Sequence, residues 1–368
     1  ISSFWVSTQY HLRMDSAHQP AIQSVPNPEL TRSHPLAAPV LRRWRLLTGG
    51  SSTRDDDRAT LVACSGGPDS SALVAILALV TPKPIIAHIV HDLRSPELTS
   101  RDRDAVAGIA NQLGCTFFEQ NIRIKDQQGN TEHNARTARY DALAQIANDQ
   151  GIRYIATGHH ADDQLETMLM NLSRGAGPRG LAGIHDTRSF QGLTIIRPML
   201  TITHEQAIEV CNLASLDPVH DHTNDDESLT RNRVRHQLLP AMRELDPEIA
   251  SRASTTADSC RSVISALRQL VEEHVWLHAT LEPNSVRFTR DQLRTQPEAA
   301  LYEVFLLAID HLEQDAGHDQ MNNQSILNAS RVIKDSSTEP RTCRLGPIVL
   351  NITASQIIIT SSINGTTS

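Results

Sequence analysis

No uninterrupted apolar run in this sequence approaches the ~20 residues that a membrane-spanning helix needs. Its first residues show no basic segment followed by an apolar core, so we expect no secretory signal. The five cysteines are scattered and form no Cys-x-x-Cys pair, which argues against a zinc ribbon or an iron–sulfur site and is typical of a reducing compartment. These absences predict a cytoplasmic protein with no membrane partner.

Lysine is scarce, occurring only at Lys83, Lys125 and Lys334, and the remaining basic residues are arginines. The formal net charge of −8 is not that of a general nucleic-acid binder. Arginine binds phosphate oxygens through its fork of N–H groups, however. Local arginine clusters therefore carry more information here than the overall charge.

The length of 368 residues predicts two or three domains. Residues 1–35 are polar and proline-punctuated, and we expect them to be disordered. Residues 36–239 alternate strands and helices. Residues 240–368 are expected to form a mostly helical module that ends in a small α+β unit.

Alternation of strands and helices in the middle of the chain predicts an α/β fold, a doubly wound parallel sheet of five strands. The expected strands are 60–64, 85–90, 116–122, 153–157 and 193–197. The expected helices are 36–47, 70–80, 101–113, 132–149, 161–173 and 204–213, with later helices at 249–277 and 297–312 and late strands at 341–350 and 352–360. Ligands of such sheets bind outside the carboxyl ends of the strands, where two motifs of this chain lie.

The first motif is Ser-Gly-Gly-Pro-Asp-Ser, between a buried strand and an apolar helix. Paired glycines at a helix N-terminus let backbone N–H groups approach an anion, which predicts a phosphate cradle. No Lys-Ser or Lys-Thr follows the glycines, so this is not the common P-loop. The plain alternative is an ordinary glycine turn. The expected nucleotide-binding residues are Ser65, Gly66, Gly67, Pro68, Asp69 and Ser70, and Asp69 is a candidate ligand of nucleotide-bound Mg²⁺.

The second motif is Gly-His-His-Ala-Asp-Asp-Gln-Leu-Glu-Thr, residues 158–167. Helical spacing places His159, Asp163 and Glu166 on one face, opposite a stripe of leucine and methionine. Two acids in a first helical turn can simply compensate the helix dipole. They can also hold Mg²⁺ or accept a proton, and a zinc site is a weaker alternative because its third ligand would be poorly placed.

Three segments carry arginines that fit an anion or RNA contact. They contain Arg174 and Arg179, then Arg231, Arg233 and Arg235, and finally Glu132, Arg136 and Arg139 on one expected helix. Taken singly, such clusters are more often solvated faces or i,i+4 ion pairs.

Together these motifs resemble those of one family, the tRNA(Ile)-lysidine synthetases, within the ATP pyrophosphatases that contain a PP-loop. The similarity extends over roughly residues 36–242 and includes Ala-His-Ile-Val-His-Asp-Leu-Arg at 87–94 and Arg-Asn-Arg-Val-Arg at 231–235. Two positions depart from the family pattern: Val90 stands where a polar residue is usual, and Asp92 where glycine is usual.

The resemblance implies an adenine nucleotide α-hydrolase-like fold and a ligase that uses ATP and Mg²⁺. Its substrates would be free L-lysine and tRNA(Ile) with a CAU anticodon, whose wobble cytidine becomes lysidine. A homodimer is one expectation for its assembly. The implied catalytic residues are Asp69, Asp163, Glu166, Arg231 and Arg233, with Asp69 and Asp163 at the metal. The implied nucleotide contacts add His88, Gly158 and His159 to the glycine loop, and the implied tRNA contacts are Glu132, Arg136, Arg139, Arg174, Arg179 and Arg235.

Three other readings stay open. A tRNA thiolase would usually need paired reactive cysteines, and an amidating synthetase of the NAD or GMP type would not explain the arginine segments. A nucleotide-binding RNA module without catalysis would not explain the acids on the 161–173 helix.

Overall fold

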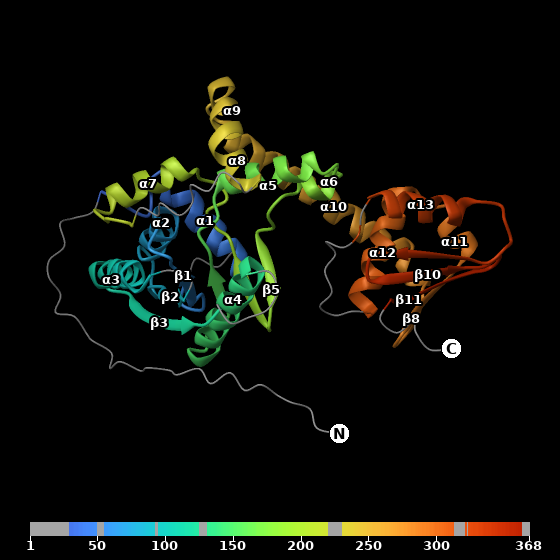
Figure 1. The fold of residues 1–368 in the computed structure, drawn as a ribbon, viewed down its shortest axis with the longest axis horizontal. Helices are drawn as coiled ribbons and strands as arrows, with labels where there is room; N and C mark the ends of the chain where they lie inside the picture. The colour runs from blue at the N-terminus through green and yellow to red at the C-terminus, as the bar shows by residue number, and fades with distance from the viewer. Residues whose placement is uncertain are drawn as a thin grey trace. The chain divides into compact units, whose positions relative to one another are not determined.

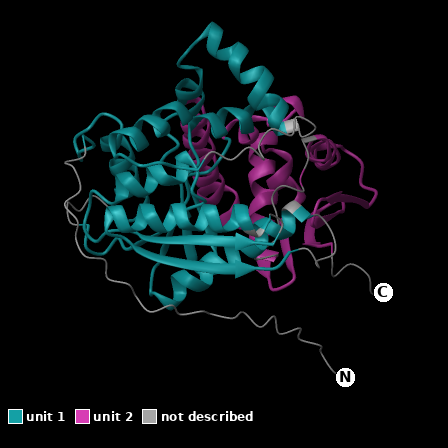
Figure 2. Cartoon of the chain, turned by 60° about the vertical axis from the view of Figure 1, so that its left-hand side comes forward, with its two compact units in different colours: residues 1–170, 183–255 teal, residues 171–182, 256–368 magenta. Residues whose placement is uncertain are grey.

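The computed structural model describes residues 29–49, 55–92, 95–124, 131–219, 230–312, 321 and 323–362. The contacts divide the chain into two units, coloured separately in Figure 2. Unit 1 comprises residues 1–170 and 183–255, and unit 2 comprises residues 171–182 and 256–368. The domain boundary expected between residues 239 and 240 stays a prediction.

Unit 1 is built on a six-stranded sheet in the order β3-β2-β1-β4-β6-β5. Its strands are β1 (Thr60–Ala63), β2 (Ile85–His91), β3 (Thr116–Ile122), β4 (Tyr154–Ala156), β5 (Thr187–Phe190) and β6 (Leu193–Ile196). All neighbours pair in parallel except β5, which runs antiparallel to β6. The predicted fold class and its five parallel strands are confirmed. The sixth strand escaped prediction because it is mostly exposed at the sheet edge and has no apolar run.

Helices cover both faces of this sheet (Figure 1). The helices of unit 1 are α1 (Ala37–Leu47), α2 (Pro68–Leu77), α3 (Pro96–Leu113), α4 (Thr131–Asp149), α5 (Ala161–Ser173), α7 (His204–Leu213), α8 (Thr230–Arg233), the π-helix η2 (Val234–Leu238) and α9 (Leu239–Leu245). The last residues of α5 belong to unit 2, and the first residues of α10 belong to unit 1.

Successive residues of the central strands enter two different cores. Leu61 packs with Tyr140 and Leu143 of α4, whereas the next residue, Val62, packs with the cluster that contains α1, α2 and α7. Because side chains alternate across a strand, a strand buried on both faces must be apolar at every position. This is why the sequence around Leu61 and Val62 in β1 is an unbroken apolar run, whereas β3 at the sheet edge contains exposed polar residues.

Part of the expected N-terminal extension is ordered. Leu30 is 3% exposed within the core that holds Trp44, and the Arg32 guanidinium donates to the Leu79 carbonyl. The expectation of disorder is therefore wrong for residues 29–35, where a single leucine gave no periodic signal. Residues 1–28 lie outside the described residues.

Unit 2 contains an antiparallel sheet in the order β7-β8-β11-β10-β9, packed with helices around its own core. Its strands are β7 (Thr280–Glu282), β8 (Ser285–Thr289), β9 (Arg341–Leu345), β10 (Ile348–Ile352) and β11 (Gln356–Ser361). Its helical elements are α6 (Pro178–Leu181), most of α10 (Ile249–His274), the 3-10 helix η3 (Trp276–His278), α11 (Arg290–Arg294), α12 (Glu298–Leu312) and α13 (Asn323–Lys334).

The late strand expected at residues 341–350 is two strands. A turn at Gly346, whose φ is +54°, separates β9 from β10 and makes them a hairpin. Among the described residues, no helix has the length and apolar character needed to span a membrane.

Candidate functional site

The glycine loop joins β1 to α2 in a conformation that only this sequence type adopts easily. Gly66 has a φ of +94°, and a Cβ there would lie 3.3 Å from the Val106 side chain. The Ser70 hydroxyl donates to the Gly67 carbonyl and accepts the Ser65 N–H, at 3.1 and 3.2 Å. The loop is thus closed on itself. Pro68 has no N–H, so the Asp69 and Ser70 N–H groups are the ones at the start of α2 that can face an anion.

The second motif touches the first through its backbone. A Cβ on Gly158 would lie 3.0 Å from the Asp69 carbonyl carbon and oxygen and from the Ser70 nitrogen. Only glycine allows this approach, so residue 158 brings the end of β4 against the start of α2. The expectation that both motifs meet at one crevice is confirmed.

A cavity of about 800 Å³ lies at this junction. Its lining includes most of the residues expected from the sequence: Ser65, Gly67, Pro68, Asp69, Ser70, His88, Arg136, Arg139, Gly158, His159, Asp163, Arg231 and Arg235. Gly66 is not in the lining, and its positive φ sets the turn of the loop. Glu166 is fully buried beside it, in contact with two of the lining arginines.

Other expected residues lie elsewhere. Arg233 is exposed and does not line the cavity. Arg174 and Arg179 belong to unit 2, where Arg179 pairs with the buried Glu303 and its guanidinium lies 5.3 Å from the Tyr302 ring centroid. The side chain of Glu132 lies outside the described residues. Arg174, Arg179 and Glu132 stay predictions as tRNA contacts. Arg233 was expected to be catalytic, and its position outside the cavity lining favours a contact with the tRNA instead.

Two arginines of α8 and η2 hold the two acids of α5. Arg231 donates through Nε to Glu166 and through Nη2 to Asp163, at 2.8 and 2.9 Å. Arg235 repeats this pattern at 2.6 and 3.2 Å. Both oxygens of Glu166 and one oxygen of Asp163 are therefore occupied by guanidinium groups. Asp163 and Glu166 therefore bind two cationic side chains beside the glycine loop.

The π-helix η2 puts a third arginine on the same face. Eight residues of regular α-helix separate Arg235 from Arg243 by about 800°, which is about 80° off a common face. The extra residue that a π-turn accommodates offsets about 100°, so the two side chains nearly align. Arg243 then reaches Asp162 on the same helix α5, at 2.7 Å.

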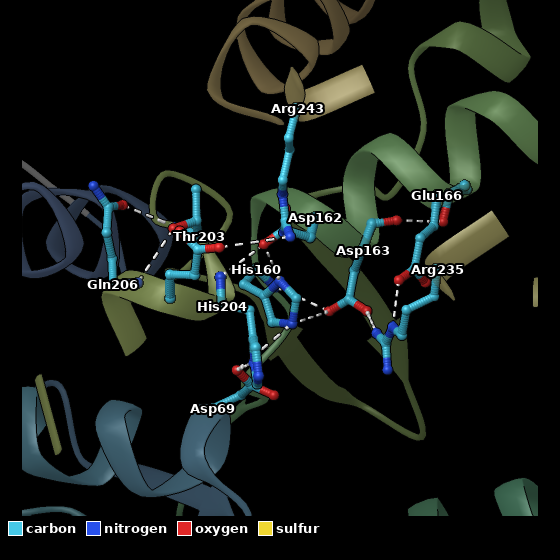
Figure 3. A network of polar contacts seen from close by, with 12 residues as sticks. Asp69, His160, Asp162, Asp163, Glu166, Thr203, His204, Gln206, Arg235 and Arg243 are labelled. Carbon is cyan, nitrogen blue, oxygen red and sulfur yellow. Dashed lines mark hydrogen bonds and ion pairs between the residues drawn. The ribbon is translucent and has the colours of Figure 1, made fainter. Parts of the chain in front are cut away.

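A second network surrounds His160 of the second motif (Figure 3). Its Nε2 lies 3.6 Å from Asp69 and 3.5 Å from Asp163, and its Nδ1 lies 3.5 Å from Asp162. His204, the first residue of α7, contacts Asp69 through Nδ1 at 2.7 Å and donates its backbone N–H to Asp162, also at 2.7 Å.

These neighbours set the protonation states at the site. Burial alone would lower the pKa of His160, but the surrounding carboxylates, Asp163 first, raise it to about 9. Burial would likewise raise the pKa of Asp163, yet His160 and the other cationic neighbours hold it at about 2. Desolvation lowers the pKa of His159 to about 4, so this imidazole is neutral at pH 7. Its Nδ1 lies 2.9 Å from the Thr157 hydroxyl.

Val90 and Asp92, which depart from the expected family pattern, lie at the end of β2 and directly after it. Asp92 accepts the Ile124 backbone N–H at 2.8 Å, so its side chain closes the turn after β2 onto the segment after β3. Val90 lines the cavity and places apolar surface where a polar group was expected. His88 lines it too, with its Nδ1 2.9 Å from the Cys64 carbonyl.

Comparison with known proteins identifies the family. A family model described as PP-loop domain matches residues 43–242. A tRNA(Ile)-lysidine synthase from Salinispora arenicola is 38% identical over 228 residues, which cover 60% of this chain and 68% of that protein. The chain belongs to the tRNA(Ile)-lysidine synthase family. As a PP-loop protein it uses ATP.

Similarity extends to longer tRNA(Ile)-lysidine synthases. Those of Bacillus cereus and Symbiobacterium thermophilum are 39% and 35% identical, and the matches cover 53% and 64% of this chain. The chain spans about half the length or less of these two proteins, 42% and 50%. Among solved structures, a U34-tRNA thiolase from Methanococcus maripaludis is 14% identical, with a TM-score of 0.47 over 60% of this chain and 76% of that chain.

Sequence reasoning missed four members of the network: His160, Asp162, His204 and Arg243. His160 and Asp162 adjoin residues that were singled out, but the helical spacing that selected His159, Asp163 and Glu166 did not include them. His204 follows Thr203, whose capping box marks a helix start and carries no signal of a site. Arg243 depends on the π-turn, which no periodicity analysis would find.

Proposed function

We propose that this chain converts the wobble cytidine of tRNA(Ile) with a CAU anticodon into lysidine, using ATP and free L-lysine, so that decoding changes from AUG to AUA. The observation that carries the proposal is the backbone contact between Gly158 and Asp69–Ser70. It joins a phosphate cradle and a cluster of acids and arginines at one cavity, as adenylation followed by amine attack requires.

The first step is adenylation. The C2 carbonyl oxygen of cytidine attacks the α-phosphorus of ATP, the α–β phosphoanhydride bond breaks, and pyrophosphate leaves. The free N–H groups at the start of α2 would bind phosphate oxygens, and Arg231 and Arg235 would offset the charge that develops on the leaving group. Carboxylate oxygens are the ligands that Mg²⁺ prefers, so Asp69 and Asp163, which line the cavity from its two motifs, fit this ion.

The second step is displacement of AMP by lysine. The neutral ε-amine attacks C2, the bond from C2 to the AMP oxygen breaks, and the nitrogen loses a proton. Freeing the amine at pH 7 from a pKa of ~10.4 costs roughly 4.6 kcal/mol, which a carboxylate must offset. Asp163 and Glu166 already hold two guanidinium groups. We propose that Glu166 receives the lysine ammonium or its proton, in exchange for one of these guanidinium groups.

The tRNA would approach from the arginine side of the cavity. Arg136 and Arg139 of α4 are exposed and line it, so they can reach phosphates beside a cytidine that is turned out of the anticodon loop. Arg174, Arg179, Arg233 and Glu132 stay candidates for further contacts. The catalytic domain at residues 36–239, the tRNA-binding module at 240–368 and a homodimer are further parts of this proposal.

Labelled lysine tests the proposal. The chain is incubated with ATP, labelled lysine and a tRNA transcript that bears CAU, and a transcript with U at the wobble position serves as control. We expect one lysine per CAU tRNA, with one AMP released. ATP–pyrophosphate exchange without lysine incorporation would instead identify another adenylating enzyme.

Two neighbouring arginines supply a matched pair of variants. Arg231→Ala removes donors to Asp163 and Glu166 and should lower kcat by about 10²-fold or more, as loss of a charge-stabilising donor does. Arg233→Ala leaves those bonds intact and should raise the KM for tRNA with little change in kcat. Equal losses of kcat in both variants would contradict these roles.

A further inference from the structure

Three side chains at the starts of α2, α5 and α7 place metal-ligand atoms close together, beside the acids that Arg231 and Arg235 hold. Asp69 of α2 offers a carboxylate oxygen, and His204 of α7 and the buried His160, just before α5, each offer a ring nitrogen. All three atoms lie within 4.8 Å of one another. Two imidazoles and one carboxylate are a donor set that suits Zn²⁺, Co²⁺ and similar ions, whereas Mg²⁺ prefers oxygen alone.

Asp162 lies behind both histidines of this set. One of its oxygens accepts the His204 backbone N–H at 2.7 Å, which fixes the start of α7, and lies 3.5 Å from His160 Nδ1, the nitrogen that points away from Asp69. Arg243 holds the other oxygen at 2.7 Å, and Asp162 is only 3% exposed. A carboxylate behind a ligating histidine is the arrangement that fixes ring orientation in metal sites.

The set is open on one side. His160 is buried, but the side chains of Asp69 and His204 are 30% and 41% exposed and both line the cavity. The site therefore has room for a fourth ligand from the cavity, such as water or a phosphate oxygen. Asp162 and Asp163 lie in the first turn of α5, but Arg243 pairs with Asp162 and Arg231 and Arg235 pair with Asp163, so Asp69 supplies the anionic donor of the set.

We propose that Asp69, His160 and His204 form a site for a divalent transition ion with N/O ligand preference, of the Zn²⁺ or Co²⁺ class, at the mouth of the glycine loop. Ligation requires neutral imidazole, so binding of the ion excludes protonation of the ligating ring nitrogens. The site shares Asp69 with the proposed Mg²⁺ site and differs from it in its two histidine donors, and binding of the ion can be measured without lysidine formation.

Cobalt titration of the full chain tests the site without ATP or tRNA. After treatment with a chelator, the protein is titrated with Co²⁺ and the visible absorption of the ion is followed. We expect one ion per chain, with the intense band of a four- or five-coordinate site. Zn²⁺ should displace Co²⁺ in competition, and an equal concentration of Mg²⁺ should not.

Two histidines that line the cavity provide matched variants. His204→Asn removes a half-exposed ligand and should weaken Co²⁺ binding by at least about 100-fold, and Asp162→Asn should weaken it by about 10- to 100-fold through lost orientation. His159→Asn is the control, because its ring faces Thr157, and the affinity should stay within about 2-fold of the parent protein. Circular dichroism checks that each variant folds.

Three results would overturn the inference. They are absence of stoichiometric Co²⁺ binding, unchanged affinity in a folded His204→Asn protein, and displacement of Co²⁺ by Mg²⁺ as readily as by Zn²⁺. The last would show an oxygen site.

Discussion

At the scale of single residues, glycine decides whether the two motifs can meet. The backbone at Gly158 comes so near Asp69 and Ser70 that no side chain fits between them. A methyl group would have to move the loop by a few tenths of an ångström. Phosphate binding and in-line attack depend on distances of that order.

Gly158→Ala should therefore lower kcat/KM for ATP by about 10- to 100-fold through displacement of the loop. Pyrophosphate release measured against ATP concentration gives this ratio. Gly108→Ala in α3 is the control, since a Cβ there meets nothing within 4 Å. Equal kinetics in the two variants would show that the close approach at 158 has no role in nucleotide binding.

Asp55 shows how one carboxylate ties α1 to the segment before β1. Two hydrogen bonds from Arg45, at 2.8 and 2.7 Å, lower its pKa, and the charge of Arg58 adds to the effect. Because the folded-state pKa lies below the unfolded value, the stabilisation is present above the unfolded pKa near ~3.9 and is lost as pH falls through the folded pKa.

Asp55→Asn should lower the free energy of unfolding by roughly 1–3 kcal/mol at pH 7, with a smaller difference from the parent protein below about pH 3.5. Denaturant unfolding at both pH values measures this. Asp104→Asn is the matched control, because the Arg103–Asp104 pair is exposed and should contribute little at either pH. A difference for Asp55→Asn that does not shrink in acid would argue against the ion pair.

At the scale of elements, the site forms where α2, α5 and α7 begin. Most boundaries of these helices follow from sequence: α5 and α7 were predicted over their observed lengths, and α2 begins at Pro68, two residues before its predicted start. Proline in the first turn of a helix explains that shift, since its missing N–H has no partner there in any case. The positions of these helix starts bring Asp69, Asp162, Asp163 and His204 together.

A capping box holds the start of α7. The Thr203 side chain accepts the Gln206 N–H, and the Gln206 side chain accepts the Thr203 N–H. Thr203→Ala should cost about 1 kcal/mol of stability and also raise the KM for ATP, because His204 is the next residue and contacts Asp69.

Thr289→Ala is the control, since Thr289 forms the same capping box with Gln292 at the start of α11 in unit 2. It should cost a similar free energy of unfolding and leave the KM for ATP unchanged. Nucleotide kinetics and denaturant unfolding on both variants separate the two effects. A raised KM for ATP in both variants would show that the change comes from lost stability and not from the position of His204.

At the scale of the whole molecule, each unit has its own core, and the core of unit 1 begins earlier than expected. Leu30 lies in the cluster that joins α1 and α2 to the sheet. A chain that begins at residue 36 should be less stable than one that begins at residue 29 by roughly 1.5–3 kcal/mol, the free energy of burying one leucine. Denaturant midpoints of the two chains test this, and equal midpoints would show that Leu30 adds nothing.

The sequence by itself determined the fold class and the two motifs, because both are local in the chain. Unbroken apolar runs specify strands buried on two faces, and glycines next to a strand end specify a loop that approaches an anion. Order along the chain also predicted that His159 and Asp163 would lie near the glycine loop, since neighbouring parallel strands end at one edge.

Only the tertiary structure decided which charged groups pair. Asp69 and His204 are 135 residues apart, and Arg231 and Glu166 are 65 apart. Periodicity tells which face of a helix is buried, and it does not tell which distant side chain meets that face. Packing decides the partners of Glu166, the role of Asp162 and the alignment of Arg243 through a π-turn. Charges removed from water must find opposite charges wherever the folded chain places them.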